Sequence, residues 1–258
     1  MQTLQARLAQ PEVVQAQPAE YLANHYHGLG SQRNDFRNHN LNCLIASMVT
    51  GDSVLDIGCG SGRLLTMLQR DGRQGFGIDP NPDLIEMAGR LNPRLRIYEG
   101  IGDDIGRLGR RFSTITIIDV LEHIKDDRRQ LRKIHDALRP AGQLIVLVPA
   151  FQMLFGKRDH RNGHFRRYSR KELIEKVTEA GFRVTQARYW NAMGFLPYLI
   201  AERIFRRELN GDLRTDETKN PFERALVRIL HAWYKGVENR FNFGLGLSLI
   251  CVAKKRMF

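Results

Sequence analysis

The sequence predicts an α/β fold: a seven-stranded, mostly parallel sheet with helices on both faces, plus N-terminal helices and a helical insertion before the last strand. Three observations support this prediction. Strands and helices alternate along most of the 258 residues, as in an open α/β sheet. The run at 114–118 is β-branched throughout, as expected of a parallel strand buried on both faces. A glycine-rich segment, 58–62, joins a strand to a helix.

The elements follow from the apolar runs and from the residues that end them. A helical pattern at 36–48 precedes the turn Gly51-Asp52. Ser169 and Glu172 have the spacing of a capping box at the start of a later helix, and Gly181 ends that helix. The predicted strands are 53–57, 75–78, 95–98, 114–118, 144–148, 182–189 and 247–253, and the helices between them are 63–70, 83–91, 126–138 and 170–180.

These elements divide the chain into four parts. Residues 1–50 are predicted to form an N-terminal helical extension or lid, and residues 51–190 the core sheet. About 55 residues of helical pattern, 191–246, separate the last two strands, although an antiparallel pair needs only a short connection. This segment is therefore predicted to be an insertion that caps the acceptor side of the site. Residues 247–258 return to the core as the final strand.

Composition restricts the class of protein. With 42% hydrophobic and 26% charged residues, the chain falls in the globular range. Three widely spaced cysteines exclude a disulfide framework and a zinc knuckle. The start of the chain lacks a basic-then-apolar leader, and the longest apolar run, 192–201, is too short to span a bilayer. A cytoplasmic protein is therefore expected, with peripheral contact at the membrane surface as an open alternative.

Positive charge is concentrated in the C-terminal part. Residues 151–258 contain 22 basic and 11 acidic side chains, whereas residues 1–150 contain 18 basic and 17 acidic ones. This asymmetry suggests an anionic partner: nucleic acid, anionic lipid or a phosphorylated compound. A solvated basic surface without a specific partner explains it as well.

A nucleotide-type site is predicted at the first strand–loop–helix of the core. The strand 53–57 carries Asp56 and runs into Gly58-Cys59-Gly60-Ser61-Gly62. Glycines let a ligand lie against the backbone, and the following helix N-terminus presents free N–H groups. Asp79, at the end of the second strand, has the position from which a carboxylate binds a ribose diol.

This segment resembles the first motif of class I S-adenosylmethionine (SAM)-dependent methyltransferases, an acidic residue followed by any residue and Gly-x-Gly. The resemblance covers roughly residues 50–190 and the final strand, and it includes Asp119-Val120-Leu121-Glu122-His123 after the fourth strand. It also includes the turn before the fifth strand, where Ala141 replaces the usual glycine. The resemblance implies SAM as cofactor, bound by Asp56, Gly58, Cys59, Gly60, Gly62, Asp79, Pro80, Asp103, Asp119, Val120 and His123.

The loop after the fifth strand is predicted to serve the acceptor. Asp159 and Gly163-His164-Phe165-Arg166-Arg167-Tyr168 resemble a Gly-His-aromatic-Arg-Arg-Tyr loop of a bacterial subgroup of these enzymes. That subgroup is often associated with polyprenyl-phosphate glycosyltransferases and with cell-surface or secondary-metabolite pathways. Histidines and arginines there could supply a base and bind a phosphate or carboxylate; a purely structural loop is the alternative.

The candidate residues follow from these motifs. Predicted catalytic residues are His160, His164 and His123, and predicted substrate-binding residues are His27, Arg161, Arg166, Arg167 and Tyr168. No metal is predicted. The alternative is a divalent site of Asp119, Glu122 and His123, which only partly reproduces the acidic cluster of ubiquinone-pathway O-methyltransferases.

Together these features predict a SAM-dependent methyltransferase (EC 2.1.1.-) that acts on a small-molecule or lipid-like acceptor, anionic or aromatic. Signature motifs of adenine-type, C5-cytosine and protein-arginine methyltransferases are absent from the sequence. Apolar stripes with basic flanks at 192–209 and 222–243 suggest either peripheral membrane contact or a cap packed on its own domain. Two alternatives stay open: an RNA methyltransferase, and a non-enzymatic SAM-binding accessory subunit of a membrane glycosyltransferase complex.

Overall fold

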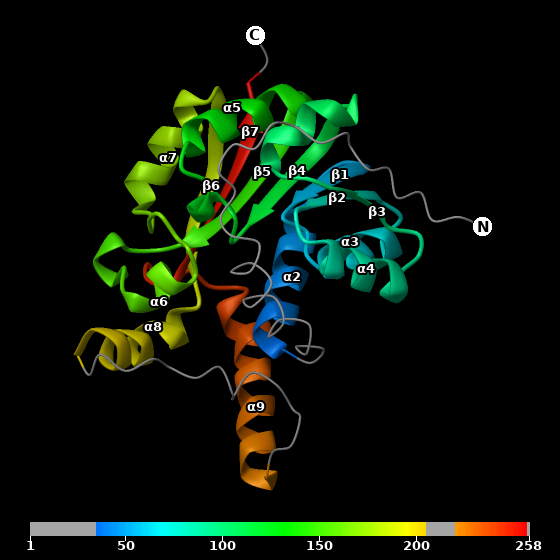
Figure 1. Cartoon of the computed structure of the whole chain (residues 1–258). Helices are drawn as coiled ribbons and strands as arrows, with labels where there is room; N and C mark the ends of the chain where they lie inside the picture. The colour runs from blue at the N-terminus through cyan, green and yellow to red at the C-terminus, as the bar shows by residue number, and fades with distance from the viewer. Residues whose placement is uncertain (1–34, 205–219, 257–258) are drawn as a thin grey trace.

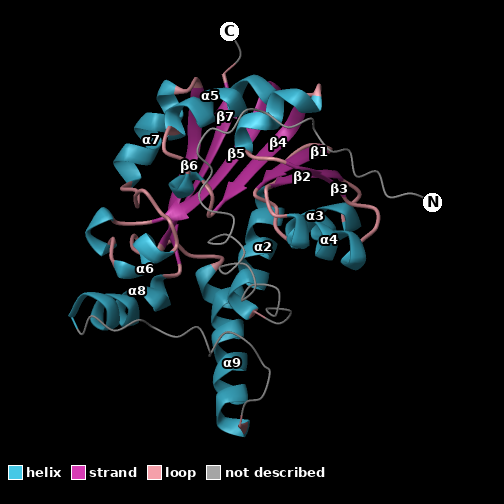
Figure 2. Ribbon diagram, viewed as in Figure 1, coloured by secondary structure: helices cyan, strands magenta, loops and turns pink. Residues whose placement is uncertain are grey.

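The predicted seven-stranded sheet is confirmed. The structure is a computed structural model that describes residues 35–204 and 220–256. The strand order is β3-β2-β1-β4-β5-β7-β6 (Figures 1 and 2), with β7 antiparallel to both neighbours and the other pairs parallel. The strands are β1 Ser53–Ile57, β2 Gln74–Asp79, β3 Arg96–Glu99, β4 Phe112–Ile118, β5 Leu138–Pro149, β6 Phe182–Trp190 and β7 Ser248–Lys255.

Helices cover both faces of this sheet. Helices α5 (Asp127–Ala137) and α7 (Arg170–Glu179) pack on one face, and α2 (Phe36–Met48) and α3 (Arg63–Arg70) on the other. Helix α4 (Pro82–Leu91) packs beside α3. Successive side chains of a strand point to opposite faces of the sheet, so each strand contributes side chains to both cores.

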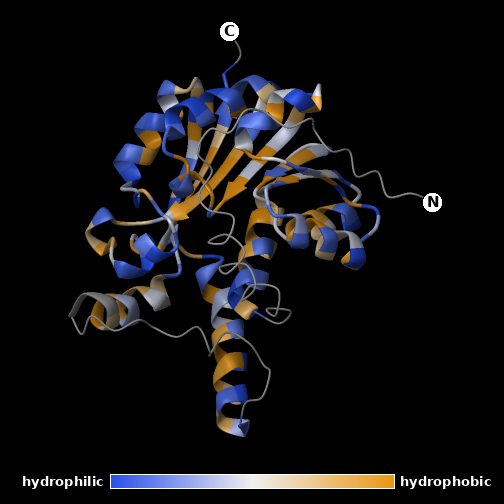
Figure 3. Cartoon of the chain, in the orientation of Figure 1, coloured by the Kyte–Doolittle hydropathy of each residue, from blue (hydrophilic) through white to orange (hydrophobic). Residues whose placement is uncertain are grey.

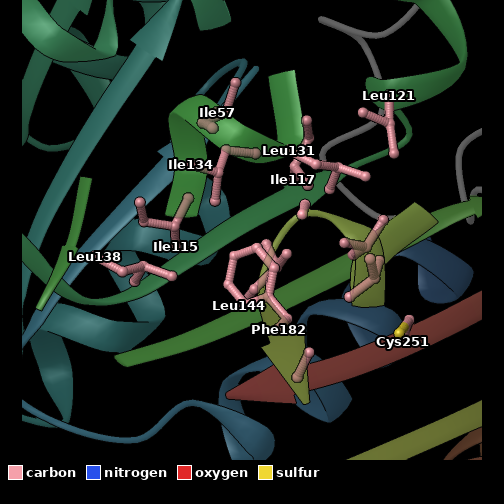
Figure 4. Packing of buried hydrophobic residues seen from close by; sticks show 14 of the residues in the cluster. Ile57, Ile115, Ile117, Leu121, Leu131, Ile134, Leu138, Leu144, Phe182 and Cys251 are labelled. Carbon is pink, nitrogen blue, oxygen red and sulfur yellow. The ribbon is translucent and has the colours of Figure 1, made fainter. Parts of the chain in front are cut away.

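The alternation is visible in the composition of the two cores. In β1, Leu55 and Ile57 belong to the cluster under α5 and α7, whereas Val54 belongs to the cluster under α2 and α3. Figure 4 shows the first cluster, in which Leu131 and Ile134 of α5 lie against the sheet.

Where it is described, the segment before the last strand is mostly helical, as predicted. Helix α8 (Ala192–Tyr198) continues as π-helical turns at Leu199–Ile204, and α9 (Pro221–Trp233) continues likewise at Tyr234–Glu238. A short helix, α6 (Lys157–Arg161), lies in the loop after β5. Helix α9 contacts α2 and projects beyond the sheet (Figure 1), and only Val227 of its residues is buried.

Most predicted boundaries agree with the structure to within two residues, but the α5–β5 junction differs. The predicted helix 126–138 ends at Ala137, and β5 begins at Leu138 rather than at 144. Leu138 pairs with Phe112 of β4 ahead of an irregularity in the ladder. The turn within this extended strand places Ala141 in the left-handed region, with φ 57°.

Replacing Ala141 by glycine is expected to stabilise the protein. A left-handed conformation costs an L-residue about 1–2 kcal/mol, which glycine avoids at a smaller entropic cost. Since Ala141 is exposed, no packing is lost, and the free energy of unfolding should rise by about 1 kcal/mol. Denaturant titration measures this, with Ala225→Gly on the exposed surface of α9 as the control that should be destabilising. A loss of stability in Ala141→Gly contradicts the prediction.

Candidate functional site

Three strands end in strained turns at one edge of the sheet. Asp119 follows β4 with φ 52°, Phe151 follows β5 with φ 62°, and Asn191 follows β6 with φ 67°. These strands are mutually parallel, so their carboxyl ends share the edge at which open α/β sheets bind ligands. Non-glycine residues in this region are uncommon and concentrate at functional sites. The three turns therefore mark this edge as the candidate site.

The glycine loop between β1 and α3 is fixed to β2 by one carboxylate. Asp79, only 2% exposed, accepts the backbone N–H of Gly60 at 2.7 Å and that of Asn81 at 2.9 Å. Gly58, Gly60 and Gly62 all have left-handed φ angles. A Cβ on Gly58 would overlap the side chain of Val120, whereas one on Gly60 would meet only Leu84, at 3.9 Å. The loop thus leaves backbone open to a ligand at Gly60 and packs against the β4 exit at Gly58.

Two buried carboxylates lie beneath this loop. Asp56 is 5% exposed and accepts a hydrogen bond from the Thr116 hydroxyl at 2.6 Å. Desolvation raises the pKa of Asp56 to about 7, and the neighbouring Asp79 charge adds to the rise. Desolvation also raises the pKa of Asp79. Among the described residues, no cationic side chain lowers the pKa of either carboxylate. A positively charged ligand would therefore stabilise the ionised form of both.

The residues present fit SAM, the cofactor that the sequence predicts. Its ammonium and sulfonium groups supply positive charge, its ribose supplies two hydroxyl donors, and the paired carboxylates, when ionised, are acceptors only. The space beside the Gly60 backbone is open, so a ligand can lie in close contact with it. The assignments of Cys59 and Pro80, which flank these carboxylates in sequence, stay predictions.

The pH dependence of SAM affinity is expected to report the ionisation of Asp56. Below its pKa of about 7 the carboxyl carries a proton that a cationic ligand must displace. Affinity should therefore fall by up to about tenfold per pH unit below pH 7 and level off above it. Calorimetry from about pH 5.5 to about pH 7.5 avoids deprotonation of the ligand's own amino group. In Thr116→Val the lost hydrogen bond raises the pKa further, so the midpoint should move to higher pH; an unchanged profile contradicts the assignment.

The predicted adenine contact involves two adjacent aspartates with different surroundings. Asp103 is exposed and pairs with Lys133 of α5 at 2.8 Å and with Arg129 at 3.4 Å. Asp104 is buried, and its side chain accepts the backbone N–H of Ile101 at 3.0 Å. The role of Asp103 toward the adenine stays a prediction, and its two ion pairs hold it on the α5 side.

A cluster of two partly buried histidines and two buried carboxylates joins the β4 exit to the loop after β5. The rings of His123 and His164 meet edge to face with centroids 4.7 Å apart. His164 Nδ1 lies 2.8 Å from Asp159 Oδ1, and its Nε2 lies 3.9 Å from Glu122 Oε1. The backbone N–H of Phe165 donates to the Glu122 carbonyl at 2.9 Å, which ties the two segments together. The structure thus gathers two of the three predicted catalytic histidines.

Glu122 has the most perturbed carboxyl of this cluster. It is 1% exposed, and its Oε2 has no hydrogen-bond partner among the described residues. Desolvation, with a further contribution from Asp119, raises the pKa of Glu122 well above its ordinary value. Burial therefore favours the protonated form of the Glu122 carboxyl that faces the two histidines.

Glu122, His123 and His164 each offer one donor atom within 4.8 Å of the others, the spacing of a metal site. The set differs from the alternative weighed from the sequence, because His164 takes the place of Asp119. That no metal takes part stays a prediction.

The remaining predicted residues are distributed unevenly. His160, on α6, is exposed and packs its ring on Phe155 with centroids 4.8 Å apart. Arg161 is exposed on the same helix. Arg166 pairs with Asp127 at 2.8 Å and donates to the Lys125 carbonyl. His27 lies outside the described residues.

Two predicted substrate-binding residues are instead internal. Tyr168 has no exposed surface and donates its hydroxyl to Asp127 at 2.9 Å. Arg167 is 5% exposed and donates to Asp159 and to the Tyr198 hydroxyl. Direct contact of Tyr168 with substrate is therefore wrong, because the side chain is buried under α7. Arg167 supports Asp159 rather than presenting a free cation.

An aromatic cluster at this edge was missed from the sequence. Phe151, in its left-handed turn after β5, stacks on Tyr189 of β6 with centroids 4.9 Å apart and planes 6° from parallel. Phe195 of α8 meets Phe151 edge to face at 5.4 Å. The three residues come from three elements, so only their isolated aromatic character was visible in the sequence.

Comparisons with known proteins identify the family of the chain. Residues 29–187 match the family described as "Methyltransferase domain". The ubiquinone biosynthesis O-methyltransferase of Azorhizobium caulinodans is 33% identical over 100 residues, which are 37% of this chain and 40% of that protein. The chain thus spans about two fifths of the length of the curated relatives that it matches.

Solved structures share the fold at low sequence identity. A methyltransferase from Haloferax volcanii, in complex with the Trm112 methyltransferase activator, matches with a TM-score of 0.61 and 20% identity over 93% of this chain and 97% of that chain. A SAM-dependent methyltransferase from Archaeoglobus fulgidus matches with a TM-score of 0.56 and 18% identity over 91% of this chain and 99% of that one. The family match covers more than half of the chain and includes the glycine loop, both buried carboxylates and the histidine cluster. The chain therefore belongs to the methyltransferase domain family.

Proposed function

We propose that the protein transfers a methyl group from SAM to a small-molecule or lipid-like acceptor with an aromatic part. The observation that carries this proposal is the juxtaposition, at one sheet edge, of the glycine loop over Asp56 and Asp79 with the His123–His164 cluster. The glycine loop and its two carboxylates suit a cationic nucleoside, and the histidine cluster suits an acceptor group that must lose a proton.

The chemistry divides between ligand and protein. When bound, SAM supplies an electrophilic methyl group on a sulfonium. The protein's part is to hold the acceptor in line with that methyl group, and alignment of this kind is worth roughly 7–11 kcal/mol. Asp56 and Asp79 bind and orient the donor, the strained turns at Asp119 and Phe151 shape the edge, and a histidine takes the acceptor proton.

The acceptor class rests on two supports. The curated relative named above is a ubiquinone biosynthesis O-methyltransferase, which favours a small-molecule acceptor. The stacked Phe151 and Tyr189, partly exposed at the β5 exit, offer a flat apolar surface of the kind that aromatic rings pack on.

Calorimetry followed by turnover tests the proposal. Ligand-stripped protein should bind SAM and S-adenosylhomocysteine, and it should methylate members of a panel of phenols, catechols and anionic lipids in a radiolabel transfer assay. Turnover of RNA alone favours the nucleic-acid alternative. Binding without turnover of any acceptor favours an accessory subunit, and absence of binding refutes the proposal.

We further propose peripheral contact with anionic membranes through α9. None of the helices in 35–204 and 220–256 has the length and hydrophobicity to cross a membrane. On α9, Phe222 and Ile229 are 77% and 65% exposed. By helical spacing they share one side, and the exposed Arg224 and Arg228 lie on the other. Figure 3 shows hydrophobic and hydrophilic residues alternating along α9. Interfacial helices have this division of apolar and basic faces.

Vesicle sedimentation tests this surface. The protein should sediment with phosphatidylglycerol vesicles, and the paired change Phe222→Glu and Ile229→Glu should weaken binding at least about tenfold, because two large side chains lose apolar burial. Leu91→Glu is the matched control, since Leu91 is 47% exposed on the distant α4. Equal sedimentation of the paired variant and the control contradicts the membrane contact.

A further inference from the structure

We propose that Asp159 is a positioning residue that holds His164 with Nε2 as its free base, and that the acceptor this base serves is a hydroxyl compound. The inference rests on the proposed methyl transfer and specifies its acceptor. It starts from a contact that the sequence motif did not explain, the pairing of Asp159 with His164 Nδ1 at 2.8 Å.

Asp159 is held as an ionised acceptor. It is 1% exposed, and the Arg167 Nε–H group donates to its Oδ1 at 2.8 Å and to its Oδ2 at 2.9 Å. The backbone N–H of Gly156 donates to Oδ2 at 3.0 Å. The hydrogen bonds from His164 and Arg167 and the Arg167 charge hold the pKa of Asp159 below its ordinary value despite burial.

An ionised Asp159 determines the tautomer of His164. A carboxylate without a proton can only accept, so Nδ1 of the neutral imidazole must carry the hydrogen and Nε2 must carry the lone pair. Glu122 Oε1 lies 3.9 Å from Nε2, which exceeds hydrogen-bond distance. The base nitrogen therefore faces the His123–Glu122 side, at the β4 exit, and no hydrogen bond among the described residues engages it.

Such a base discriminates among acceptors by their chemistry. A carboxylate acceptor is already ionised at neutral pH and gains nothing from it, whereas a phenol, with a pKa near 10, does. In the transfer, the acceptor O–H gives its proton to Nε2 and its oxygen lone pair forms the new O–CH3 bond. The S–CH3 bond breaks with its electron pair on sulfur, which leaves neutral S-adenosylhomocysteine. The imidazolium, stabilised by Asp159, then releases the proton to water.

The tautomer is testable without any acceptor. In isotope-labelled wild-type protein, the ring-nitrogen chemical shifts of His164 should show hydrogen on Nδ1 and none on Nε2. In Asp159→Asn the two tautomers should become mixed. Hydrogen on Nε2 in the wild type overturns the proposal whether or not the proposed function is correct.

Kinetics separate positioning from structural support. With catechol, Asp159→Asn should lower kcat by about 10²–10³-fold with the KM for SAM unchanged. With nitrocatechol, which ionises more readily, the loss should be much smaller. An equal loss on both acceptors makes Asp159 merely structural. Asp127→Asn, at a buried carboxylate that binds Lys176 and Tyr168, is the matched control: it should reduce stability without changing the ratio of the two rates.

The remaining measurements use the wild-type protein. Its rate of catechol methylation should be unchanged by EDTA. A rate that falls with EDTA and recovers with a divalent cation would make His164 a metal ligand and overturn its role as base. Turnover of carboxylate acceptors, and of neither catechol, overturns the hydroxyl class while leaving methyl transfer intact. Failure of all turnover contradicts the proposed function, and the tautomer measurement still decides the role of Asp159.

Discussion

His164→Ala is expected to lower kcat by about 10²–10⁴-fold while SAM affinity stays unchanged. The loss is that of a general base placed at the reacting group. His164 is the histidine whose Nδ1 is bound by a buried carboxylate and whose Nε2 lies beyond hydrogen-bond distance of Glu122. Removing the ring takes away the base and leaves the glycine loop, on other elements, intact.

Comparing kcat in three alanine variants tests which histidine is the base. His160→Ala should have the smallest effect, because His160 is exposed on α6 and contacts Phe155 rather than the cluster. His123→Ala should have an intermediate effect through loss of the ring that supports His164. If kcat falls further in His160→Ala than in His164→Ala, the general base is His160 on α6 and the assignment to His164 is wrong. Calorimetric SAM binding and thermal unfolding check that each variant is folded.

Asp79→Ala should weaken SAM binding by a few kcal/mol, about 10²-fold in affinity. The carboxylate is 2% exposed and accepts the Gly60 and Asn81 N–H groups, so its removal leaves two buried donors without a partner and frees the loop from β2. It also removes the acceptor proposed for the ribose hydroxyls.

The control is another aspartate of the same segment. Asp83, in the first turn of α4, is exposed, so Asp83→Ala should leave SAM affinity close to that of the wild type. Calorimetric titration of both variants gives the comparison. If Asp79→Ala binds SAM as tightly as Asp83→Ala does, the ribose assignment is wrong.

Much of the fold could be predicted because local patterns determine it. The periodicity of Phe36–Met48 and Arg63–Arg70 predicted both helices with the observed bounds, and the Ser169 side chain accepts the Glu172 N–H as expected of a cap. The α5–β5 junction was misjudged, since Leu138 joins the sheet through a pairing with Phe112 that is distant in sequence.

The site divides in the same way. Sequence alone determined the glycine loop, Asp56 at the end of β1 and Asp79 at the end of β2, because backbone conformation and strand ends follow from neighbouring residues. Tertiary structure alone decided that Tyr168 is buried under α7, that Glu122 faces His164, and that Phe151 stacks on Tyr189. The physical reason is that partners and burial depend on how separate elements pack, whereas a residue's type shows only which contacts it is able to make.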